Sequence, residues 1–505
     1  MGGTAERAHL ALWGPESCRR VHDATLTVLE ECGVEVRNHP QSLELFAVAG
    51  AQVDGPRVRF APELVERALA SAPKTWLVPW RPLPDGGARA THDDAAGPAR
   101  EAAGGAGSAG APRGLLTLSD GNSYFGPGSD CLYLRDPDTH ERRRITVADV
   151  EGLARVCDRL PNLDFAMSMG LPGDVPLEVD DLAAVVAMLA GTRQPLLVAP
   201  KDGLAVGVVR DMAAACGEGG SVMIYAMPSP PLLHDGDALG KIVACAALEV
   251  PLIYAPSPAC GTTAPRSVPA AVVVGNAEVL SGLVLHQHVR PGAPFVYGAG
   301  VGAPDMRTAF DPHGAPEVWL GSQLGADLAR FYGLPSFNYA GMTDANDLDE
   351  QWSAEEFALT VLGALQRSTL IHDVGYLEVG LQSSYEALVF GDECVAWARA
   401  LMWDVRVDDE ALALDEIIRV GPGGHHLASR YTRRHTRDFW LPTLFDRVMH
   451  DRWRAGGGLS LRRRVEEKVV ALRAEPPAWT LPQATRAGLD ELLDEARRRR
   501  AEAAA

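Results

Sequence analysis

From residue 147 to about residue 402, short apolar runs alternate regularly with longer helical stretches. The runs are rich in apolar residues, as expected for parallel strands that are buried on both faces. They lie at residues 165–169, 195–199, 222–226, 252–255, 295–297, 336–339 and 369–371. Successive runs are roughly 34 residues apart, which leaves room for a helix in every βαβ unit. This repetition favours an α/β fold of the TIM (β/α)8 barrel type over a doubly wound open sheet, because no GxGxxG motif follows an early strand.

The eighth strand of such a barrel is less evident, and we expect it at residues 376–380 or near residue 116. The flanking segments have other patterns, which include helical periodicity, a Gly/Ala-rich stretch and paired extended runs. The expected domains are an N-terminal helical region (1–84), a flexible Gly/Ala-rich insertion (85–114), the barrel (115–402, with a leading hairpin at 120–145) and a C-terminal helical cap (403–505) that packs back on the barrel.

The overall composition excludes several classes of protein. The formal net charge of −19 disfavours a nucleic-acid partner, since phosphate binding needs a basic surface. The chain has no uninterrupted apolar run of about 18 residues, so no membrane span is predicted. Its N-terminus lacks a secretory pattern. The eight cysteines include no CxxC pair and no zinc-like spacing with histidine, so we expect reduced thiols, no metal site and a cytoplasmic protein.

Tyrosines recur at the carboxyl ends of the predicted strands, although aromatic residues make up only 6% of the chain. In a barrel these ends share one mouth, and a ring of aromatic faces is suited to a quaternary ammonium ion. The alternative is that tyrosine simply tolerates a half-buried strand end. The predicted substrate-binding residues at these ends are Tyr225, Tyr254, Tyr297 and Tyr339, followed after the last strand by His372, Tyr376 and Glu378.

No nucleophile-and-base motif stands out in the chain. GxSxG, HExxH and phosphate-loop patterns are absent, and no cysteine has an evident histidine partner. Transfer of a methyl group from a quaternary nitrogen to an external nucleophile requires no catalytic nucleophile from the protein. The protein must mainly position and desolvate the cation.

Several long segments resemble the trimethylamine methyltransferase family, in particular its pyrrolysine-free members, which are similar to glycine betaine methyltransferase. The resemblance extends over about residues 20–440. Among the segments that carry it are VHDATLTVLEECGVEV, YFGPGSDCLYLRD, ITVADVEGLARVCDRLPNLDF, GNAEVLSGLVLHQHVRPGAPFVYG, GYLEVGLQSSYEALVFGDE and VGPGGHHLASRYTRRH.

This resemblance implies a TIM barrel that acts with a small corrinoid-binding protein. Co(I) of the partner's cobamide would accept the methyl group, so no tightly bound cofactor is expected here, and the chain lacks a DxHxxG-type cobamide motif. Trimethylamine enzymes of the family carry pyrrolysine, which we expect to align near residues 337–343. Standard residues occupy that region here, which suits a substrate that is already quaternary, such as glycine betaine, carnitine or proline betaine.

For such substrates Arg307 or His372 would pair with a carboxylate, although Arg307 is equally well explained as part of a surface ion pair. Asp344 would orient a loop or repel the wrong anion, or else is an ordinary turn residue. Glu378 is expected as a network partner of Tyr376, Tyr385 or His372, and Tyr385 completes the predicted substrate-binding residues.

The alternatives are a trimethylamine methyltransferase proper, an inactive barrel that binds quaternary ammonium, and a barrel enzyme of another reaction type. A homo-oligomer is expected in each case.

Overall fold

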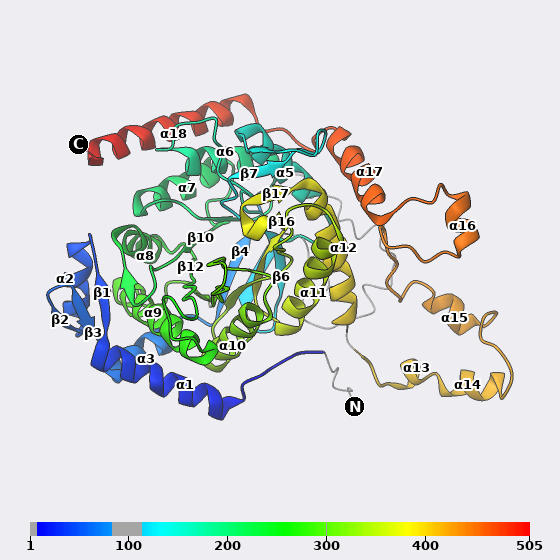
Figure 1. The fold of residues 1–505 in the computed structure, drawn as a ribbon, viewed down its shortest axis with the longest axis horizontal. Helices are drawn as coiled ribbons and strands as arrows, with labels where there is room; N and C mark the ends of the chain where they lie inside the picture. Colours follow the sequence, from blue (N-terminus) through cyan, green and yellow to red (C-terminus); the bar gives the residue numbers. More distant parts are fainter. Residues whose placement is uncertain (1–7, 83–113, 299, 404, 505) are drawn as a thin grey trace.

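The computed structural model describes residues 8–82, 114–298, 300–403 and 405–504, and its centre is a barrel of parallel strands surrounded by helices (Figure 1). Seven strands form one parallel sheet. Their spatial order is β6 (Tyr124–Pro127), β15 (Leu370–Val374), β14 (Ser336–Tyr339), β13 (Phe295–Gly298), β12 (Leu252–Tyr254), β10 (Val222–Ala226) and β9 (Leu196–Val198). Their short, apolar sequences are those of strands covered on both sides.

Residues 164–169 close the barrel between its two edge strands. Ala166 forms a parallel bridge with Leu196 of β9, and the Asp164 amide donates to the Phe125 carbonyl of β6 at 2.7 Å. The segment therefore acts as the eighth strand, although its hydrogen bonding is irregular, and the α/β fold is a (β/α)8 barrel.

The barrel strand that the sequence left undecided is β6, and both positions expected for it, residues 376–380 and the region near residue 116, were wrong. Barrel strand β6 comes from the region expected to form a leading hairpin, and only β7 (Tyr133–Arg135) and β8 (Arg142–Arg144) pair there as antiparallel neighbours. Residues 376–377 form β16 (Tyr376–Leu377), which pairs with β17 (Gln382–Ser384) above the barrel. The segment near residue 116 is β5 (Leu115–Ser119), which pairs with β4 (Thr75–Pro79).

A helix follows every barrel strand and covers the outside of the sheet (Figure 1). Side-chain caps begin several of these helices, for example Asp202, Asp235 and Ser384, each of which accepts a backbone amide of the first turn. The eight helices are α5 (Val147–Arg159), α6 (Asp180–Gly191), α7 (Gly203–Ala215), α8 (Gly236–Leu248), α9 (Val268–Val289), α10 (Pro316–Tyr332), α11 (Glu350–Gln366) and α12 (Tyr385–Leu401).

The N-terminal region packs on the outside of α9. It contains α1 (Pro15–Thr27), a π-helical turn (Val28–Cys32), β1 (Val34–Val36), α2 (Pro40–Ala49), β2 (Gln52–Asp54), β3 (Arg57–Arg59) and α3 (Pro62–Ser71). Strand β1 also pairs with β11 (Leu233–His234), which joins the region to a barrel loop. Within the described residues α9 alone is long and apolar enough to cross a membrane, but 72% of its apolar window is buried, as in a core helix.

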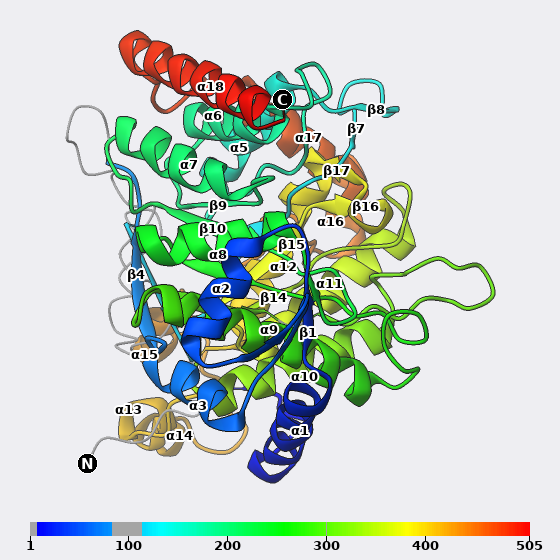
Figure 2. The same cartoon turned by 90° about the vertical axis from the view of Figure 1, so that its left-hand side faces the viewer.

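The β4–β5 hairpin closes the amino-terminal end of the barrel. Its buried side chains Val78, Leu116 and Leu118 belong to the same apolar cluster as Phe165 and Leu370 of the barrel interior. In Figure 2, β4 lies at one end of the barrel, and β16 with the loops that follow the strands lies at the other. Among the described residues the hairpin thus covers the amino-terminal end, and the mouth of the barrel lies at the carboxyl ends of the strands.

Residues 83–113, which contain most of the Gly/Ala-rich insertion expected at 85–114, lie outside the described residues. After α12 the chain forms α13 (Asp409–Leu412), α14 (Leu414–Val420), α15 (Arg430–His435) and α16 (His450–Ala455), which project from the barrel (Figure 1). It then returns as α17 (Leu461–Ala474), which packs on α12, and α18 (Gln483–Ala504), which packs on α6 and α7.

Candidate active site

The alternation of side chains along each strand decides which residues enter the barrel. Tyr225 of β10, Phe337 of β14 and His372 of β15 face the interior, and they form one aromatic cluster. The rings of His372 and Phe337 stack with centroids 4.1 Å apart and an interplanar angle of 10°. The Tyr225 ring lies 5.2 Å from Phe337 and 6.2 Å from His372. We call these three side chains the aromatic wall.

Asp373 follows His372, and its carboxylate lies beside the imidazole ring. Atom Nδ1 of His372 lies 2.6 Å from Oδ1 of Asp373, and the Asp373 side chain is largely buried. Its backbone has a φ of +78°, a conformation that non-glycine residues rarely adopt and that recurs at functional sites. The strained backbone of Asp373 therefore marks this position at the mouth as a candidate functional one.

A second carboxylate, Asp130, follows β6 at the same mouth and also has a positive φ of +69°. Desolvation by the surrounding protein raises the pKa of Asp130 to about 6, with smaller contributions from the charges of Asp181 and Asp373. Asp130 and Asp373 also raise the pKa of Tyr225 beyond the effect of burial, which places both charges near the aromatic wall.

Tyr339 and Tyr376 lie together beside the aromatic wall, in a small cluster with Cys131 and Met342. The Tyr376 hydroxyl donates to the Ser129 carbonyl, and the Tyr339 hydroxyl donates to the Val318 carbonyl at 2.6 Å. Burial raises the pKa of both phenols, so both remain protonated donors. Each ring is therefore held in place by a backbone contact.

Gly128 permits the close approach of these groups. A Cβ atom at this position would collide with the Tyr376 ring and the Asp373 carboxylate. Glycine is needed here because of this contact.

Tyr254 and Tyr297 do not enter the barrel, so the expectation that they share its mouth was wrong. They occupy outward positions of β12 and β13, and their rings are buried against α9. Tyr254 stacks on His234, whose Nδ1 lies 2.5 Å from the hydroxyl, and Tyr297 donates to Asn276 at 3.0 Å. Side chains alternate between the two faces of a strand. The preceding residues Ile253 and Val296 face the interior, so Tyr254 and Tyr297 face the helices.

The remaining predicted residues lie on the surrounding loops or behind them. Arg307 is 88% exposed and pairs with Asp305 of its own loop at 2.6 Å. Asp344 accepts the backbone amides of His313 and Gly314, which joins two loops of the mouth. The side chains of Arg307 and Asp344 thus stabilise loops and do not belong to the aromatic wall.

Glu378 makes a two-pronged ion pair with Arg142, with N–O distances of 2.7 and 2.9 Å. Tyr385 is buried between α12 and α5, where its hydroxyl lies 3.4 Å from the Asp149 carbonyl. Neither side chain belongs to the aromatic wall.

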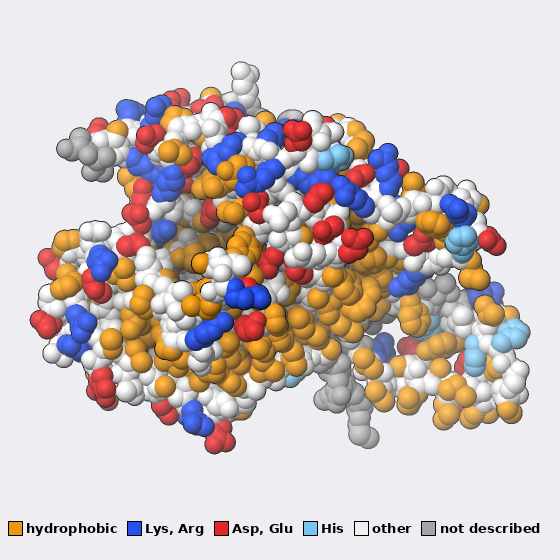
Figure 3. All heavy atoms as spheres, in the orientation of Figure 1, with side chains coloured by type: hydrophobic (Ala, Val, Ile, Leu, Met, Phe, Trp, Pro, Cys, Tyr) orange, Lys and Arg blue, Asp and Glu red, His pale blue; other side chains and the backbone are white. Residues whose placement is uncertain are grey.

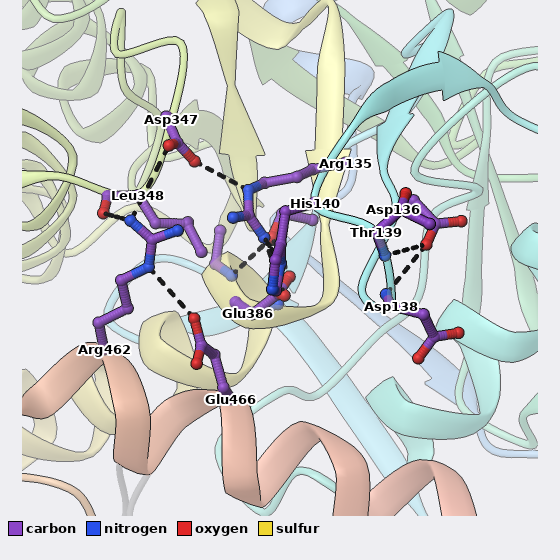
Figure 4. Close-up of polar contacts among 12 residues, drawn as sticks. Arg135, Asp136, Asp138, Thr139, His140, Asp347, Leu348, Glu386, Arg462 and Glu466 are labelled. Atoms are coloured by element: carbon purple, nitrogen blue, oxygen red, sulfur yellow. Dashed lines mark hydrogen bonds and ion pairs between the residues drawn. The ribbon is translucent and has the colours of Figure 1, made fainter. Parts of the chain in front are cut away.

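A buried ion network supports the mouth from behind (Figure 4). Arg135, which is 2% exposed, contacts Asp347 at 2.9 Å and the buried Glu386 at 3.0 Å. Asp347 also lies 3.9 Å from Arg462 of α17. The network therefore joins β7, the loop before α11, and helices α12 and α17.

Sequence reasoning missed Asp130, Phe337 and Arg135 as residues of the site or its support. Asp130 lies in the YFGPGSDC segment, but that segment was interpreted as a hairpin and so placed away from the strand ends. Among the described residues, no group of three or more His, Cys, Asp or Glu side chains is arranged to hold a metal ion.

Comparisons with known proteins bear on this site. The family model described as trimethylamine methyltransferase matches residues 4–83 and 103–504. The glycine betaine methyltransferase of Desulfitobacterium hafniense (strain Y51) is 30% identical over 454 residues, which cover 87% of each chain. The trimethylamine methyltransferase MttB of Desulfitobacterium hafniense (strain DSM 10664 / DCB-2) is 28% identical over 96% of this chain and 94% of its own length.

Among solved structures, the Methanosarcina barkeri monomethylamine methyltransferase MtmB aligns over 95% of this chain and 92% of its own, with a TM-score of 0.47 and 11% identity.

Proposed function

Because the chain belongs to the trimethylamine methyltransferase family and is a methyltransferase, we propose that it moves a methyl group from a quaternary amine to Co(I) of a corrinoid protein. Glycine betaine is the proposed type of substrate, since a glycine betaine methyltransferase is 30% identical to the chain. The corrinoid is the cofactor of the partner protein and enters this reaction as a substrate.

The observation that carries the proposed substrate class is the aromatic wall together with two nearby carboxylates. The stacked faces of Phe337 and His372 and the neighbouring Tyr225 offer a surface for a methylated ammonium group. Asp130 and Asp373 supply negative charge near this surface. This combination favours a permanent cation over a neutral amine.

The chain's own contribution is to bind, orient and desolvate the cation. In the transfer, the C–N bond breaks, its electron pair stays on nitrogen, and the tertiary amine leaves while the methyl carbon bonds to cobalt. Phe337 faces the interior in the region where we expect pyrrolysine to align in trimethylamine enzymes. A substrate that is already quaternary needs no such activation, because its leaving group is a neutral amine.

We also propose an orientation for the substrate. Arg307 already pairs with Asp305 and is largely exposed, so we do not assign it to the carboxylate of a betaine. The trimethylammonium end belongs at the aromatic wall, and the carboxylate end points toward the open mouth. All eight cysteines are free, which fits the proposed cytoplasmic location.

The test combines purified protein, Co(I) cobalamin or corrinoid proteins, and a panel of quaternary and tertiary methylamines. Formation of the methyl-Co(III) absorption spectrum with a quaternary amine supports the proposal. Turnover of trimethylamine alone would favour a trimethylamine methyltransferase. Tight binding of a quaternary amine without any cobalt methylation would instead identify a binding protein.

A further inference from the structure

One face of helix α18 packs against the barrel helices α6 and α7 (Figure 1). The side chains of this face follow one another every three or four residues, as on one side of a helix. They are Leu489, Leu493, Ala496 and Arg500. Leu489 and Ala496 are fully buried, and Leu493 packs against the same core. The apolar face of α18 therefore ends at an arginine.

Arg500 differs from the arginines that precede it in the chain. Charged side chains of both signs cover the upper edge of the molecule in Figure 3, where α18 lies in Figure 1. Arg498 and Arg499 are 71% and 56% exposed, and both pair with Glu495 of the same helix. The Arg500 side chain is only 11% exposed. A guanidinium group at this depth needs acceptors within the protein.

The guanidinium group of Arg500 forms a two-pronged ion pair with Asp181 of α6. Its Nη1 lies 2.7 Å from Oδ1 and its Nη2 lies 2.8 Å from Oδ2. The Nε atom donates to Asp202 at 2.8 Å, and Nη1 also donates to the Glu178 carbonyl at 2.6 Å. Burial by itself would raise the pKa of Asp181, but the hydrogen bonds from Arg500 hold this pKa below its usual range. Asp181 is therefore charged and paired.

Asp181 is also a neighbour of Asp130. It lies in the first turn of α6, and a helix of this fold begins near the mouth, where the preceding strand ends. The Asp181 side chain, which is 2% exposed, lines a small cavity together with Asp130 and Ser168. The volume of this cavity is about 10 Å³, which leaves room for roughly one water molecule. The two carboxylates therefore lie close to one another at the mouth.

Charged groups from several other elements also surround Asp130. Desolvation is the main cause of its raised pKa, Lys241 of α8 opposes this effect, and Asp181 and Asp373 add to it. The Lys241 ammonium group donates to the Pro200 carbonyl at 3.0 Å. Burial and, to a smaller degree, the Asp130 charge raise the pKa values of three further groups near this carboxylate, which are Cys131, Tyr225 and Tyr376. Asp181 connects this set of charges to α18 through Arg500.

We propose that Arg500 is a positioning residue of the amine site, which acts through Asp181 on the Asp130 carboxylate. The ion pair of Arg500 and Asp181 has no net charge. Without Arg500, Asp181 would be an unpaired negative charge beside Asp130 and would favour the protonated, neutral form of that carboxyl. Arg500 thus keeps Asp130 in the charged form that attracts an ammonium group. This inference rests on the proposed function, in which Asp130 faces the amine.

The first experiment measures glycine betaine binding to the full-length chain by isothermal titration calorimetry over a range of pH. In the wild type, affinity should rise with a midpoint near pH 6, where Asp130 titrates. Arg500→Gln should move this midpoint upward by about half a unit or more, because a like charge raises the pKa of a carboxyl. Asp181→Asn should move it downward, because it removes that charge and leaves the cation. A general loosening of the fold would not produce shifts of opposite sign.

Two further variants of α18 serve as controls. Arg500→Lys retains the cation, so its midpoint should stay near that of the wild type. The matched control Arg499→Gln removes an arginine that is 56% exposed and should leave the midpoint unchanged. Circular dichroism establishes that each variant is folded. The inference is overturned if Arg500→Gln and Asp181→Asn both leave the midpoint unchanged, if they move it in the same direction, or if Arg499→Gln moves it as far as Arg500→Gln.

A second measurement requires no amine, so it separates this inference from the proposed function. The difference in melting temperature between the wild type and Asp130→Asn reports the Asp130 carboxyl. Its pKa is about 6 in the folded chain and 3.8 ordinarily, so the stability that it contributes is fully present below about pH 3.8 and is lost as the pH rises through about 6.

The same difference, measured between R500Q and R500Q/D130N, should be lost over a range that extends to higher pH. Loss over the same pH range in both backgrounds would overturn the inference. An extended range in R500Q together with a wild type that binds no quaternary amine would contradict the proposed function, while supporting the link from Arg500 to Asp130.

Discussion

The imidazole of His372 stacks on the ring of Phe337 with centroids 4.1 Å apart, while its Nδ1 atom lies 2.6 Å from the Asp373 carboxylate. The ring thus stacks on an aromatic face and has a carboxylate beside its edge. An aromatic ring with an adjacent carboxylate attracts a cation more strongly than a ring alone, because the charge and the π face act in the same direction.

Phe337→Leu should weaken binding of a quaternary amine by roughly 2- to 30-fold, the range that cation–π contacts contribute. The substitution removes the ring on which His372 stacks and one face of the aromatic wall. Isothermal titration calorimetry measures the dissociation constant. Phe295→Leu is the matched control, because Phe295 of the neighbouring β13 is equally buried but packs on His286 in the helix layer. Equal losses of affinity in both variants would show that Phe337 has no direct contact with the amine.

Amine affinity should rise as the pH increases through about 6, because desolvation raises the pKa of the Asp130 carboxyl to about that value. Below this pH the carboxyl is protonated and neutral, and above it the carboxylate attracts the cation. Asp130→Asn should bind more weakly at pH 7.5 and lose this pH dependence. The exposed Asp23 of α1 provides the control Asp23→Asn. An unchanged pH profile in Asp130→Asn would assign the titration to another group.

Gly128→Ala should destabilise the protein by about 1–3 kcal/mol, as expected for overpacking of a close contact. It should also weaken amine binding, since the new methyl group displaces the Tyr376 ring and the Asp373 carboxylate. Thermal unfolding and calorimetry measure the two effects. Gly488→Ala in α18 is the control, because no atom lies within 4 Å of its added Cβ. A Gly128→Ala protein with normal stability and affinity would mean that the mouth adapts freely.

Arg135→Met should destabilise the protein by about 3–5 kcal/mol, because it leaves the buried Glu386 without its ion-pair partner. Adding Glu386→Gln should recover part of the loss, since the unpaired charge is then removed. Urea denaturation measures the free energy of unfolding. Arg462→Met, at a side chain that is 39% exposed, should cost less than about 1 kcal/mol. A double variant no more stable than Arg135→Met would contradict this explanation.

The barrel was predictable because its strands are short apolar runs at even spacing, a pattern that few other folds produce. Strand β6 was missed for a physical reason. Its sequence, Tyr-Phe-Gly-Pro, has two turn-forming residues, and it becomes a strand only by pairing with β15 about 245 residues later in the chain. Local propensity contains no information about that pairing.

The face of the strand on which each tyrosine lies could not be predicted from the sequence pattern either. Tyr225 and Tyr254 both stand near the end of a predicted strand, yet one faces the interior and the other faces α9. A shift of one residue in the strand reverses the face, and the end of a run cannot be located to one residue from the sequence alone. The Arg135 network was equally hidden, because its partners are 212 and 251 residues away.

Under the proposed function the β4–β5 hairpin has a kinetic consequence, because among the described residues it covers the amino-terminal end of the barrel. Amine and methyl acceptor would then share the mouth at the carboxyl ends of the strands, and the amine would have to enter before the acceptor docks over it. We therefore expect a compulsory order of binding, in which free acceptor at high concentration competes with the entry of amine and slows turnover.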